Sequence, residues 1–416
     1  MQNYLPRLVD ELLDEYVGEL SALMLIGPRG CGKTTTAVRR ATSVLRLDQP
    51  QVASAFRTDP DAVLAAQDLP VLIDEWQEVP ESMGALKRAV DAGADPGSYL
   101  VTGSVRARRE PGQWPGTGRV VPVEMYGLTV AEIEQAAPPP RLEGALLGSP
   151  PAARMLLEAP DLVGYLELAL RGGFPDAVGL SARARSAWYE GYVDQLVHRD
   201  VAALESIRSP ERLLRLLRAV ALNTAGGPSE TALAEAAGLD VRTARNYLDL
   251  LQDLRIIDRV PAWHTSRFSR LVKTPKYYVM DPGLAAQLIG IDREAALRSG
   301  DVLGRLIDTF VTAQIRPLLA LGTGPVSLSH LRDRGGAHEV DLILEWRNGD
   351  VLAIEIKSSS SVSRRDARHL EWLRNELGSR FIQGVVLHTG GTALHLGDRV
   401  AALPIASLWR PATTSG

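Results

Sequence analysis

Cysteine is nearly absent from this chain, in which Cys31 is the single cysteine among 416 residues. No disulfide can therefore form within the chain, which is typical of proteins kept in a reducing compartment. Long apolar runs are also missing, because no stretch approaches the roughly 18 residues that a transmembrane helix needs. The first residues lack the basic-then-apolar order of a secretory signal peptide. We therefore expect a cytoplasmic protein without a membrane partner.

Lysine is scarce as well, since only five of the 46 lysine and arginine residues are lysine. A lysine ammonium is a compact charge that arginine does not replace at close-range phosphate or metal chemistry. The few lysines, among them Lys33 and Lys357, therefore indicate where such chemistry could lie. The formal net charge of −4 argues against a uniformly basic protein that wraps nucleic acid, although a local basic patch remains compatible with it.

The pattern G-x-x-x-x-G-K-[ST], the Walker A motif, begins at Gly27 and ends at Thr34. An apolar run over residues 22–26 precedes it and a helix-forming segment follows it. A buried strand, a glycine-rich loop and a helix in this order direct backbone N–H groups at an anion. Lys33 would reach the β- and γ-phosphates of ATP and the Thr34 hydroxyl would bind Mg²⁺, whereas the alternative is a chance glycine turn. The residues expected at the nucleotide are Gly27, Pro28, Arg29, Gly30, Cys31, Gly32, Lys33, Thr34 and Thr35.

Two carboxylates, Asp74 and Glu75, end the apolar run over residues 70–73. In P-loop proteins an aspartate at such a strand end holds Mg²⁺. Glu75 is then placed to activate water, so ATP hydrolysis is the expected reaction. The alternative interpretation is a solvated strand end.

Three further polar residues are candidates for the phosphate region. Thr102 and Ser104 follow the apolar strand over residues 99–102, and ligands of three-layer sheets lie at the carboxyl ends of strands. They could sense the nucleotide, or form a simple turn. Arg119 stands at the entrance to a strand over residues 120–123, where it could stabilise phosphate charge in cis or from a neighbouring subunit, or be a surface arginine.

Strands and helices alternate over the first 125 residues. We expect a strand over residues 52–56, helices over 59–67 and 82–91, and the strands that end at Asp74 and Thr102. Such alternation predicts a parallel sheet with helices on both faces. The fold class is therefore α/β.

A helix-turn-helix pattern follows a helical region. Residues 230–237 and 241–254 read as two helices, with Val241 facing inward on the second. Arg242, Arg245 and Asn246 point outward near its N-terminus, where a recognition helix contacts DNA. Residues 256–260 and 276–279 would form a two-stranded wing, with the basic residues Arg267, Arg270, Lys273 and Lys276 in the loop between its strands. A packing or lid module is the alternative to DNA contact.

A second group of charged residues lies in the last quarter of the chain. Asp341 opens one expected strand, and Glu355 and Lys357 lie two residues apart on the next, which puts them on one face. If the strands are neighbours, the carboxylates converge where Mg²⁺ or Mn²⁺ could bind. A metal there would activate water against a phosphodiester, with Lys357 stabilising charge. The alternative is ordinary alternating charge on a strand.

Several motifs together carry a family resemblance: Tyr4-Leu5-Pro6-Arg7, the glycine-rich loop, Ile73-Asp74-Glu75, Thr102-Gly103-Ser104, Gly118-Arg119, Gly172-Gly173-Phe174-Pro175, Arg199-Asp200, and Pro275-Lys276-Tyr277-Tyr278 before Asp281-Pro282-Gly283. The chain resembles, nearly end to end, prokaryotic AAA+-like P-loop ATPases whose C-terminal half is a domain of unknown function. That resemblance implies ATP binding and hydrolysis. The last part is similar to the PD-(D/E)xK nucleases, with Asp341, Glu355 and Lys357 at the core positions and Asp308 where family members usually carry glutamate.

We thus expect four parts: a AAA+-like ATPase domain over residues 1–135, a linker and helical lid over 136–225, a winged helix-turn-helix over 226–290, and a nuclease-like domain of the restriction-endonuclease type over 300–416. The expected function is an ATPase whose nucleotide state controls DNA binding and the nuclease-like domain. Two alternatives remain: a switch with a non-cleaving C-terminal scaffold, and a signalling ATPase without a nucleic-acid partner. The protein could form an oligomer in any of these cases.

Overall fold

The computed structural model describes residues 4–103, 118–136, 141–147, 154–155, 158–200, 209–263, 274–322, 324–333 and 337–410, without the side chains of 154–155 and 199–200. The chain divides into two compact units. Unit 1 comprises Met1–Gly127 and Asp253–Ile256, and unit 2 comprises Leu128–Gln252 and Ile257–Gly416. Within the described residues, no helix combines the length and the apolar composition that crossing a membrane requires.

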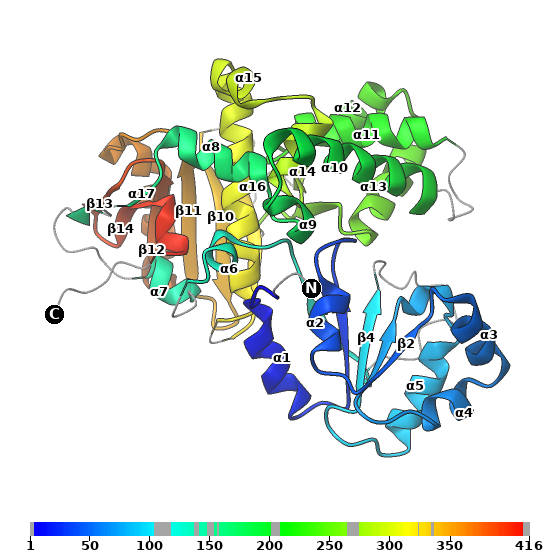
Figure 1. Cartoon of the computed structure of the whole chain (residues 1–416). Helices are drawn as coiled ribbons and strands as arrows, with labels where there is room; N and C mark the ends of the chain where they lie inside the picture. The colour runs from blue at the N-terminus through cyan, green and yellow to red at the C-terminus, as the bar shows by residue number, and fades with distance from the viewer. Residues whose placement is uncertain are drawn as a thin grey trace. The chain divides into compact units, whose positions relative to one another are not determined.

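Unit 1 is built on a five-stranded sheet in the order β2-β3-β4-β1-β5; Figure 1 labels two of its strands, β2 and β4. Every neighbouring pair is parallel, which confirms the expected parallel α/β sheet. All five residues of β1 are buried, because helices cover both of its faces, and this explains the continuous apolar run. The strands are β1 Ala22–Ile26, β2 Ser43–Arg46, β3 Val71–Asp74, β4 Tyr99–Gly103 and β5 Val121–Glu124.

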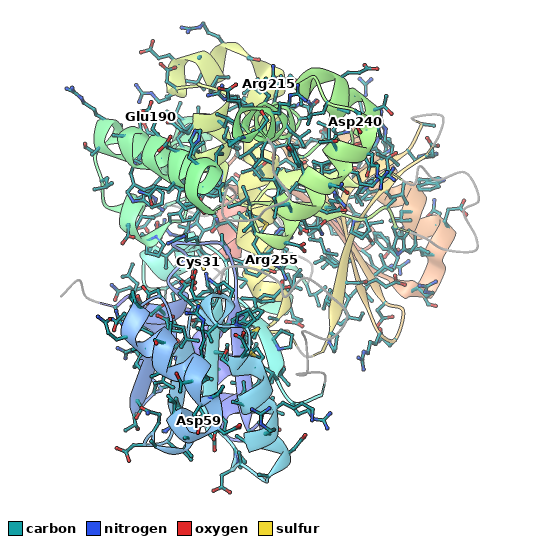
Figure 2. The ribbon with its side chains drawn as sticks, turned by 90° about the vertical axis from the view of Figure 1, so that its right-hand side faces the viewer. Cys31, Asp59, Glu190, Arg215, Asp240 and Arg255 are labelled. Atoms are coloured by element: carbon teal, nitrogen blue, oxygen red, sulfur yellow. The ribbon has the colours of Figure 1, made fainter. Side chains whose placement is uncertain are left out.

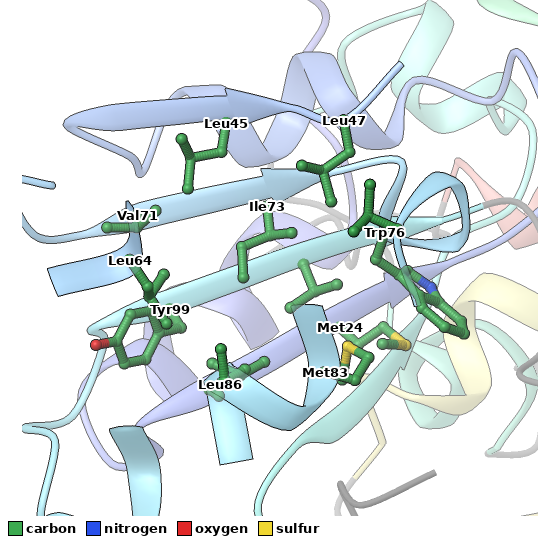
Figure 3. Packing of buried hydrophobic residues seen from close by; sticks show 14 of the residues in the cluster. Met24, Leu45, Leu47, Leu64, Val71, Ile73, Trp76, Met83, Leu86 and Tyr99 are labelled. Atoms are coloured by element: carbon green, nitrogen blue, oxygen red, sulfur yellow. The ribbon is translucent and has the colours of Figure 1, made fainter. Parts of the chain in front are cut away.

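Two layers of helices enclose this sheet. Alternate residues of β1 point to opposite faces: Met24 packs in a cluster with side chains of α3, α4 and α5 (Figure 3), and Leu23 in a cluster with side chains of α1 and α2. The helices of unit 1 are α1 Val9–Val17, α2 Lys33–Val38, α3 Pro50–Thr58, α4 Pro60–Ala65 and α5 Ser82–Asp91.

The expected strand over residues 52–56 is wrong, because these residues lie in α3. Pro50 occupies the first turn, where its missing N–H costs nothing. Ala53 and Phe56, three residues apart, are the buried ones, which is a helical spacing. The strand beside β3 is instead β2, immediately before this helix.

Four residues far along the chain, Asp253–Ile256, belong to unit 1. The first of them is the last residue of α13 (Val241–Asp253). Within unit 1, the guanidinium of Arg255 pairs with the carboxylate of Glu124 at the end of β5, and the Tyr126 hydroxyl donates to the same carboxylate at 2.6 Å. Glu124 lies opposite Ile26, the last residue of β1, in the parallel register.

Unit 2 contains a helical part and a second sheet. Its seven strands are ordered β6-β13-β14-β12-β11-β10-β9, with β10 and β11 antiparallel neighbours and β11 and β12 parallel. The strands are β6 Arg154–Met155, β9 Val326–Arg332, β10 Glu339–Trp346, β11 Val351–Lys357, β12 Phe381–His388, β13 Thr392–Gly397 and β14 Val400–Pro404, and a separate antiparallel pair is β7 Ile257–Val260 with β8 Lys276–Val279. The helices are α6 Val130–Ile133, α7 Leu142–Leu146, α8 Leu162–Arg171, α9 Pro175–Val178, α10 Ala182–Gln195, α11 Pro210–Leu222, α12 Glu230–Ala237, α13, α14 Pro282–Leu288, α15 Arg293–Arg298, α16 Gly300–Leu319 and α17 Arg368–Leu377.

The Gly172-Gly173-Phe174-Pro175 motif joins three helices of unit 2. Gly172 ends α8 with a φ of 68°, and a Cβ there would lie 2.1 Å from the Tyr189 hydroxyl of α10. The carboxylate of Asp281, at the start of α14, accepts hydrogen bonds from the Gly173 N–H at 2.6 Å and from the Tyr189 hydroxyl at 2.8 Å. A side chain at Gly172 would displace this buried network, so the motif has a packing role.

Candidate functional site

The glycine-rich loop of unit 1 connects the end of β1 to the start of α2. Gly30 and Gly32 have φ angles of 78° and 99°, a region that side chains other than glycine rarely adopt. Gly27 is required for another reason: a Cβ there would lie 2.2 Å from the backbone oxygen of Met125. The loop is thus pinned against the residue that follows β5. Pro28 and Cys31 are buried in it, whereas Arg29 and Thr35 are exposed.

Lys33 lies over the loop with its side chain buried. Its Nζ donates hydrogen bonds to the backbone oxygens of Gly27 at 3.0 Å and Pro28 at 2.9 Å. The ammonium is therefore held by neutral carbonyl groups at the loop. A phosphate oxygen, which is charged, would be a stronger acceptor for the same ammonium.

Thr34, Asp74 and Thr102 meet at the carboxyl ends of β1, β3 and β4. The Thr34 hydroxyl donates to Asp74 Oδ1 at 2.7 Å, and the fully buried Thr102 hydroxyl donates to the same oxygen. A hydroxyl and a carboxylate at this distance are oxygen ligands of the kind that Mg²⁺ prefers, so the donor set fits Mg²⁺. Thr102 has a role that the sequence analysis missed, since it orients Asp74. Ser104 lies outside the described residues.

Glu75 follows Asp74 directly and is half-buried. Its φ of 56° turns the chain sharply at the end of β3, and its carboxylate accepts a hydrogen bond from the Gln77 amide. The backbone turn sets the direction of the Glu75 side chain, and the hydrogen bond from the Gln77 amide keeps its carboxylate in place.

Arg119 is not brought to the loop within unit 1. It precedes β5, which runs parallel to β1, so it lies at the amino-terminal edge of the sheet while the loop leaves the carboxyl-terminal edge. Five residues of β1 separate these edges by roughly 15 Å. Arg119 pairs there with Asp91 at 2.7 Å. The structure therefore gives no support to a role in cis.

In unit 2, the helices expected for a helix-turn-helix are α12 and α13. Asp240 caps α13, because its Oδ1 accepts a hydrogen bond from the Thr243 N–H at 2.9 Å. Figure 2 labels Asp240 and Arg215 of α11 in this part of the chain.

The outward residues of α13 are exposed as expected: Arg242, Arg245 and Asn246. Arg245 pairs with Glu230 of α12 at 2.7 Å. Val241, expected to face inward, is 38% exposed, so that expectation is wrong. Arg267, Arg270 and Lys273 lie outside the described residues, and DNA contact stays a prediction.

The acidic group of the last quarter of the chain is assembled by two neighbouring strands. Leu342 pairs with Ile354 in the β10–β11 register, which places Asp341 beside Glu355. Lys357 Nζ donates to Glu355 Oε2 at 2.9 Å, and the Ile356 N–H donates to Asp341 Oδ2 at 2.9 Å.

Lys276 is the residue of this cluster that the sequence analysis missed. It comes from β8, is 4% exposed, and its Nζ lies 2.9 Å from Asp341 Oδ1. From the same strand, the Tyr278 hydroxyl donates to Asp308 Oδ1 of α16 at 3.1 Å. The scarcity of lysine was the available signal, because Lys276 is one of only five.

The electrostatics of the cluster depend on this lysine. Burial alone would lower the pKa of Lys276, but the negative charges of Asp341 and Asp308, the neighbouring Tyr278 and the hydrogen bond to Asp341 together outweigh it, and the pKa is raised. Burial raises the pKa of Asp341, yet the ammonium groups of Lys276 and Lys357 together with the Ile356 N–H hydrogen bond outweigh burial, and the pKa is lowered. Burial and the neighbouring Asp341 raise the pKa of Glu355 to about 8. Burial raises the pKa of Asp308 to about 7 despite Lys276.

A cavity of about 700 Å³ opens onto the cluster, lined among others by Lys276, Arg305, Asp308, Asp341 and Lys357. In the part of the chain that the structure describes, no group of three or more His, Cys, Asp or Glu side chains could hold a metal. What sets this cluster apart from the Thr34–Asp74 site is the ammonium of Lys276, which occupies the Asp341 oxygen that a divalent ion would need, so the residues present do not fit such an ion.

Comparisons with known proteins find three family models along the chain. Residues 20–134 match the model of a AAA domain, and residues 163–295 and 303–408 match two domains of unknown function, DUF8612 and DUF4143. The uncharacterized proteins Rv2008c of Mycobacterium tuberculosis and Mb2031c of Mycobacterium bovis are each 30% identical over 390 residues, which are 92% of this chain and 79% of each relative. Among solved structures, the Walker-type ATPase PABY2304 of Pyrococcus abyssi aligns with a TM-score of 0.40 and 14% identity, over 67% of this chain and 94% of that one.

Proposed function

The chain belongs to the family of the mycobacterial proteins Rv2008c and Mb2031c and contains a P-loop ATPase domain of the AAA type, and from this premise we propose a Mg²⁺-dependent ATPase whose nucleotide state controls its second unit. The observation that carries the proposal is the contact of Thr34 with Asp74, next to the buried Lys33. The two oxygen ligands and the ammonium stand together at one edge of the sheet, as phosphoryl chemistry requires.

Each residue of the site has a separate task. Thr34 and Asp74 would hold Mg²⁺, which when bound supplies positive charge beside the phosphates. Lys33 exchanges its carbonyl partners for phosphate oxygens of ATP. Thr102 keeps Asp74 in place through its hydrogen bond. Glu75 accepts the proton of the attacking water, so its carboxylate leaves Gln77 during the reaction.

The first experiment separates nucleotide binding from general damage to the domain. Lys33→Ala should abolish binding of a fluorescent ATP analogue and all ATP hydrolysis. Arg88→Ala is the control, because Arg88 pairs with Asp61 on the surface of unit 1 and both side chains are more than half exposed. Full ATP binding by Lys33→Ala, with the control unchanged, would refute the proposal.

In this proposal the effect of ATP binding reaches unit 2 along the polypeptide chain itself. Glu124 lies beside Ile26, which immediately precedes Gly27, and Glu124 pairs with Arg255. Arg255 lies two residues beyond the end of α13. A shift of the loop on ATP binding would therefore reach the chain that leaves α13.

For α13 we propose binding to the DNA backbone through Arg242 and Arg245, with Asn246 beside them. Arg242→Ala combined with Arg245→Ala should weaken DNA binding and reduce the slope of log affinity against log salt by roughly 2. Arg293→Ala is the matched control, since Arg293 is an exposed arginine paired with Glu167 elsewhere in unit 2. Undetectable DNA binding at low salt would favour a signalling ATPase.

The switch itself is tested by Arg255→Ala. This variant should still bind ATP, but ATP should no longer change its affinity for DNA. An unchanged ATP effect would exclude the route through Arg255.

For the C-terminal domain we favour the non-cleaving alternative over a nuclease. The specific observation is the ammonium of Lys276 on Asp341. The intact protein should not nick single- or double-stranded DNA in Mn²⁺. Nicking that disappears in Lys357→Ala would restore the nuclease interpretation.

A role of Arg119 in trans requires a second copy of the chain. Sedimentation of the protein with and without an ATP analogue decides this, because a monomer in both states leaves Arg119 without a phosphate partner.

A further inference from the structure

We propose that the ammonium of Lys276 is the built-in cation of the acidic cluster and takes the place of a divalent metal, so that the intact protein binds no Mg²⁺ or Mn²⁺ at Asp341 and Glu355. This inference deepens the proposed function and rests on its non-cleaving form. It assigns a role to β8 that neither the family resemblance nor the domain matches describe.

The first argument is the position of the Lys276 ammonium. Its Nζ lies 2.9 Å from Asp341 Oδ1 and 3.7 Å from Glu339 Oε1, inside the cluster, with 5% of the side chain exposed. Two residues along the same strand, Tyr278 donates to Asp308. Side chains of β8 therefore satisfy both Asp341 and Asp308.

The second argument is the use of the carboxylate oxygens. Both oxygens of Asp341 already accept hydrogen bonds, one from Lys276 and the other from the Ile356 N–H. Glu355 Oε2 accepts from Lys357, and its buried Oε1 has no hydrogen-bond partner among the residues that the structure describes. A divalent ion prefers about six oxygen ligands, and it would approach two ammonium groups that already bind the same carboxylates.

The third argument is that Lys276 is fixed from three sides. Val260 of β7 pairs with Lys276, and the next residue, Tyr277, exchanges backbone hydrogen bonds with Gly226 and Ala225 at 2.8 and 2.7 Å. Just before β8, the Thr274 backbone oxygen lies 3.0 Å from His330 Nε2. These contacts hold the backbone of β8 at the place from which the Lys276 side chain reaches Asp341.

Removing the ammonium should convert the cluster into a metal site. Lys276→Met keeps an unbranched apolar chain of similar length but removes the ammonium that lies nearest Asp341 and Asp308, which leaves Lys357 as the remaining cation of the cluster. A divalent cation would then supply the charge that the lysine supplied. Lys276→Gln is the second variant, in case the methionine variant does not fold.

The experiment is a titration of the full chain with MnCl₂ without nucleotide, followed by loss of the free Mn²⁺ signal in electron paramagnetic resonance. The wild type should show no site that depends on Asp341, which is checked with Asp341→Asn. Lys276→Met or Lys276→Gln should gain one site at least tenfold tighter than any wild-type site, and adding Asp341→Asn should remove it. Thermal unfolding with Mn²⁺ should show a stabilisation in the lysine variants alone.

Two results would overturn the proposal. One is a wild-type Mn²⁺ site that Asp341→Asn abolishes, because metal and lysine would then coexist. The other is a folded lysine variant that gains no site. Neither result depends on ATP hydrolysis, which is measured separately, so failure of the ATPase proposal is distinguishable from failure of this one.

Discussion

Replacement of Gly27 by alanine tests how the glycine-rich loop is held. The added Cβ would lie 2.2 Å from the backbone oxygen of Met125 and 3.1 Å from the Cys31 sulfur. The Met125 oxygen cannot retreat as a flexible side chain would, because the Met125 N–H is bonded to the Ile26 oxygen at 2.7 Å. We expect a loss in the free energy of unfolding at the upper end of the ~1–3 kcal/mol typical of overpacked interiors.

Gly84→Ala is the matched control, since it is the same substitution in the same unit. Gly84 lies inside α5, and its added Cβ would meet only the end of the Arg88 side chain, at 3.4 Å. Alanine there should stabilise the helix by roughly 0.5–1 kcal/mol. Relative to the wild type, Gly27→Ala should lower the free energy of unfolding and Gly84→Ala should raise it. The two variants should therefore differ from each other by about 2–4 kcal/mol.

Hydrogen exchange followed by mass spectrometry measures this difference in local stability, on peptides that cover β1 and β5. It suits a chain of two units, whose global unfolding need not be two-state. Gly27→Ala should also lose ATP affinity, since the displaced loop no longer aims Lys33. Normal protection together with normal ATP affinity in Gly27→Ala would show that the loop is not pinned against Met125.

Three further outcomes follow from the structure. Thr102→Val keeps the side-chain shape but removes a hydrogen bond to Asp74, so ATP turnover should fall by roughly 5- to 30-fold, the equivalent of about 1–2 kcal/mol; steady-state kinetics at saturating ATP would show an unchanged rate if Asp74 needs no such support. The pKa of Glu355 is raised from 4.5 unfolded to about 8 folded, so the folded state keeps the proton longer and the free energy of unfolding falls as the pH rises through this window. Above the window in which the lowered pKa of His330 acts in the opposite direction, urea unfolding in EDTA should show a fall of about 2 kcal/mol between pH 6.5 and 8. Glu355→Gln should remove the larger part of this fall and leave the smaller fall that Asp308, with its pKa raised to about 7, contributes in the same direction. Gly172→Ala should lower the melting temperature of unit 2, because the added Cβ would displace the Tyr189 hydroxyl. Calorimetry that finds no change would mean that the buried network around Gly172 rearranges without loss of stability.

The site of unit 1 was readable in the sequence because its parts are local. The loop, the helix that follows it and the strand end at Asp74 each have a pattern that is continuous along the chain. The error over residues 52–56 arose because a short apolar stretch fits both the two-residue repeat of a strand and the 3.6-residue repeat of a helix. The burial of Ala53 and Phe56, three residues apart, agrees with the helix. Arg119 illustrates another limit, since its distance from the loop depends on the strand direction and not on its neighbours in sequence.

The cluster of unit 2 was only half readable. Asp341, Glu355 and Lys357 lie on adjacent strands that are also adjacent in sequence, so their meeting could be predicted. Lys276 is 65 residues away from Asp341, in a segment that the sequence pattern assigned to another module. Its contact with Asp341 depends on the arrangement of β8 beside the larger sheet, which no local pattern encodes.

The four residues Asp253–Ile256 have a practical consequence for anyone who divides this protein. A fragment that stops at Gly127 would lack the arginine that neutralises Glu124 and would expose that carboxylate at the end of β5. The missing piece cannot be regained by moving the cut a few residues downstream, because it returns only after α13. Such a fragment should be less stable than the same region within the whole chain, and adding a synthetic peptide that spans residues 250–258 should restore part of the lost stability.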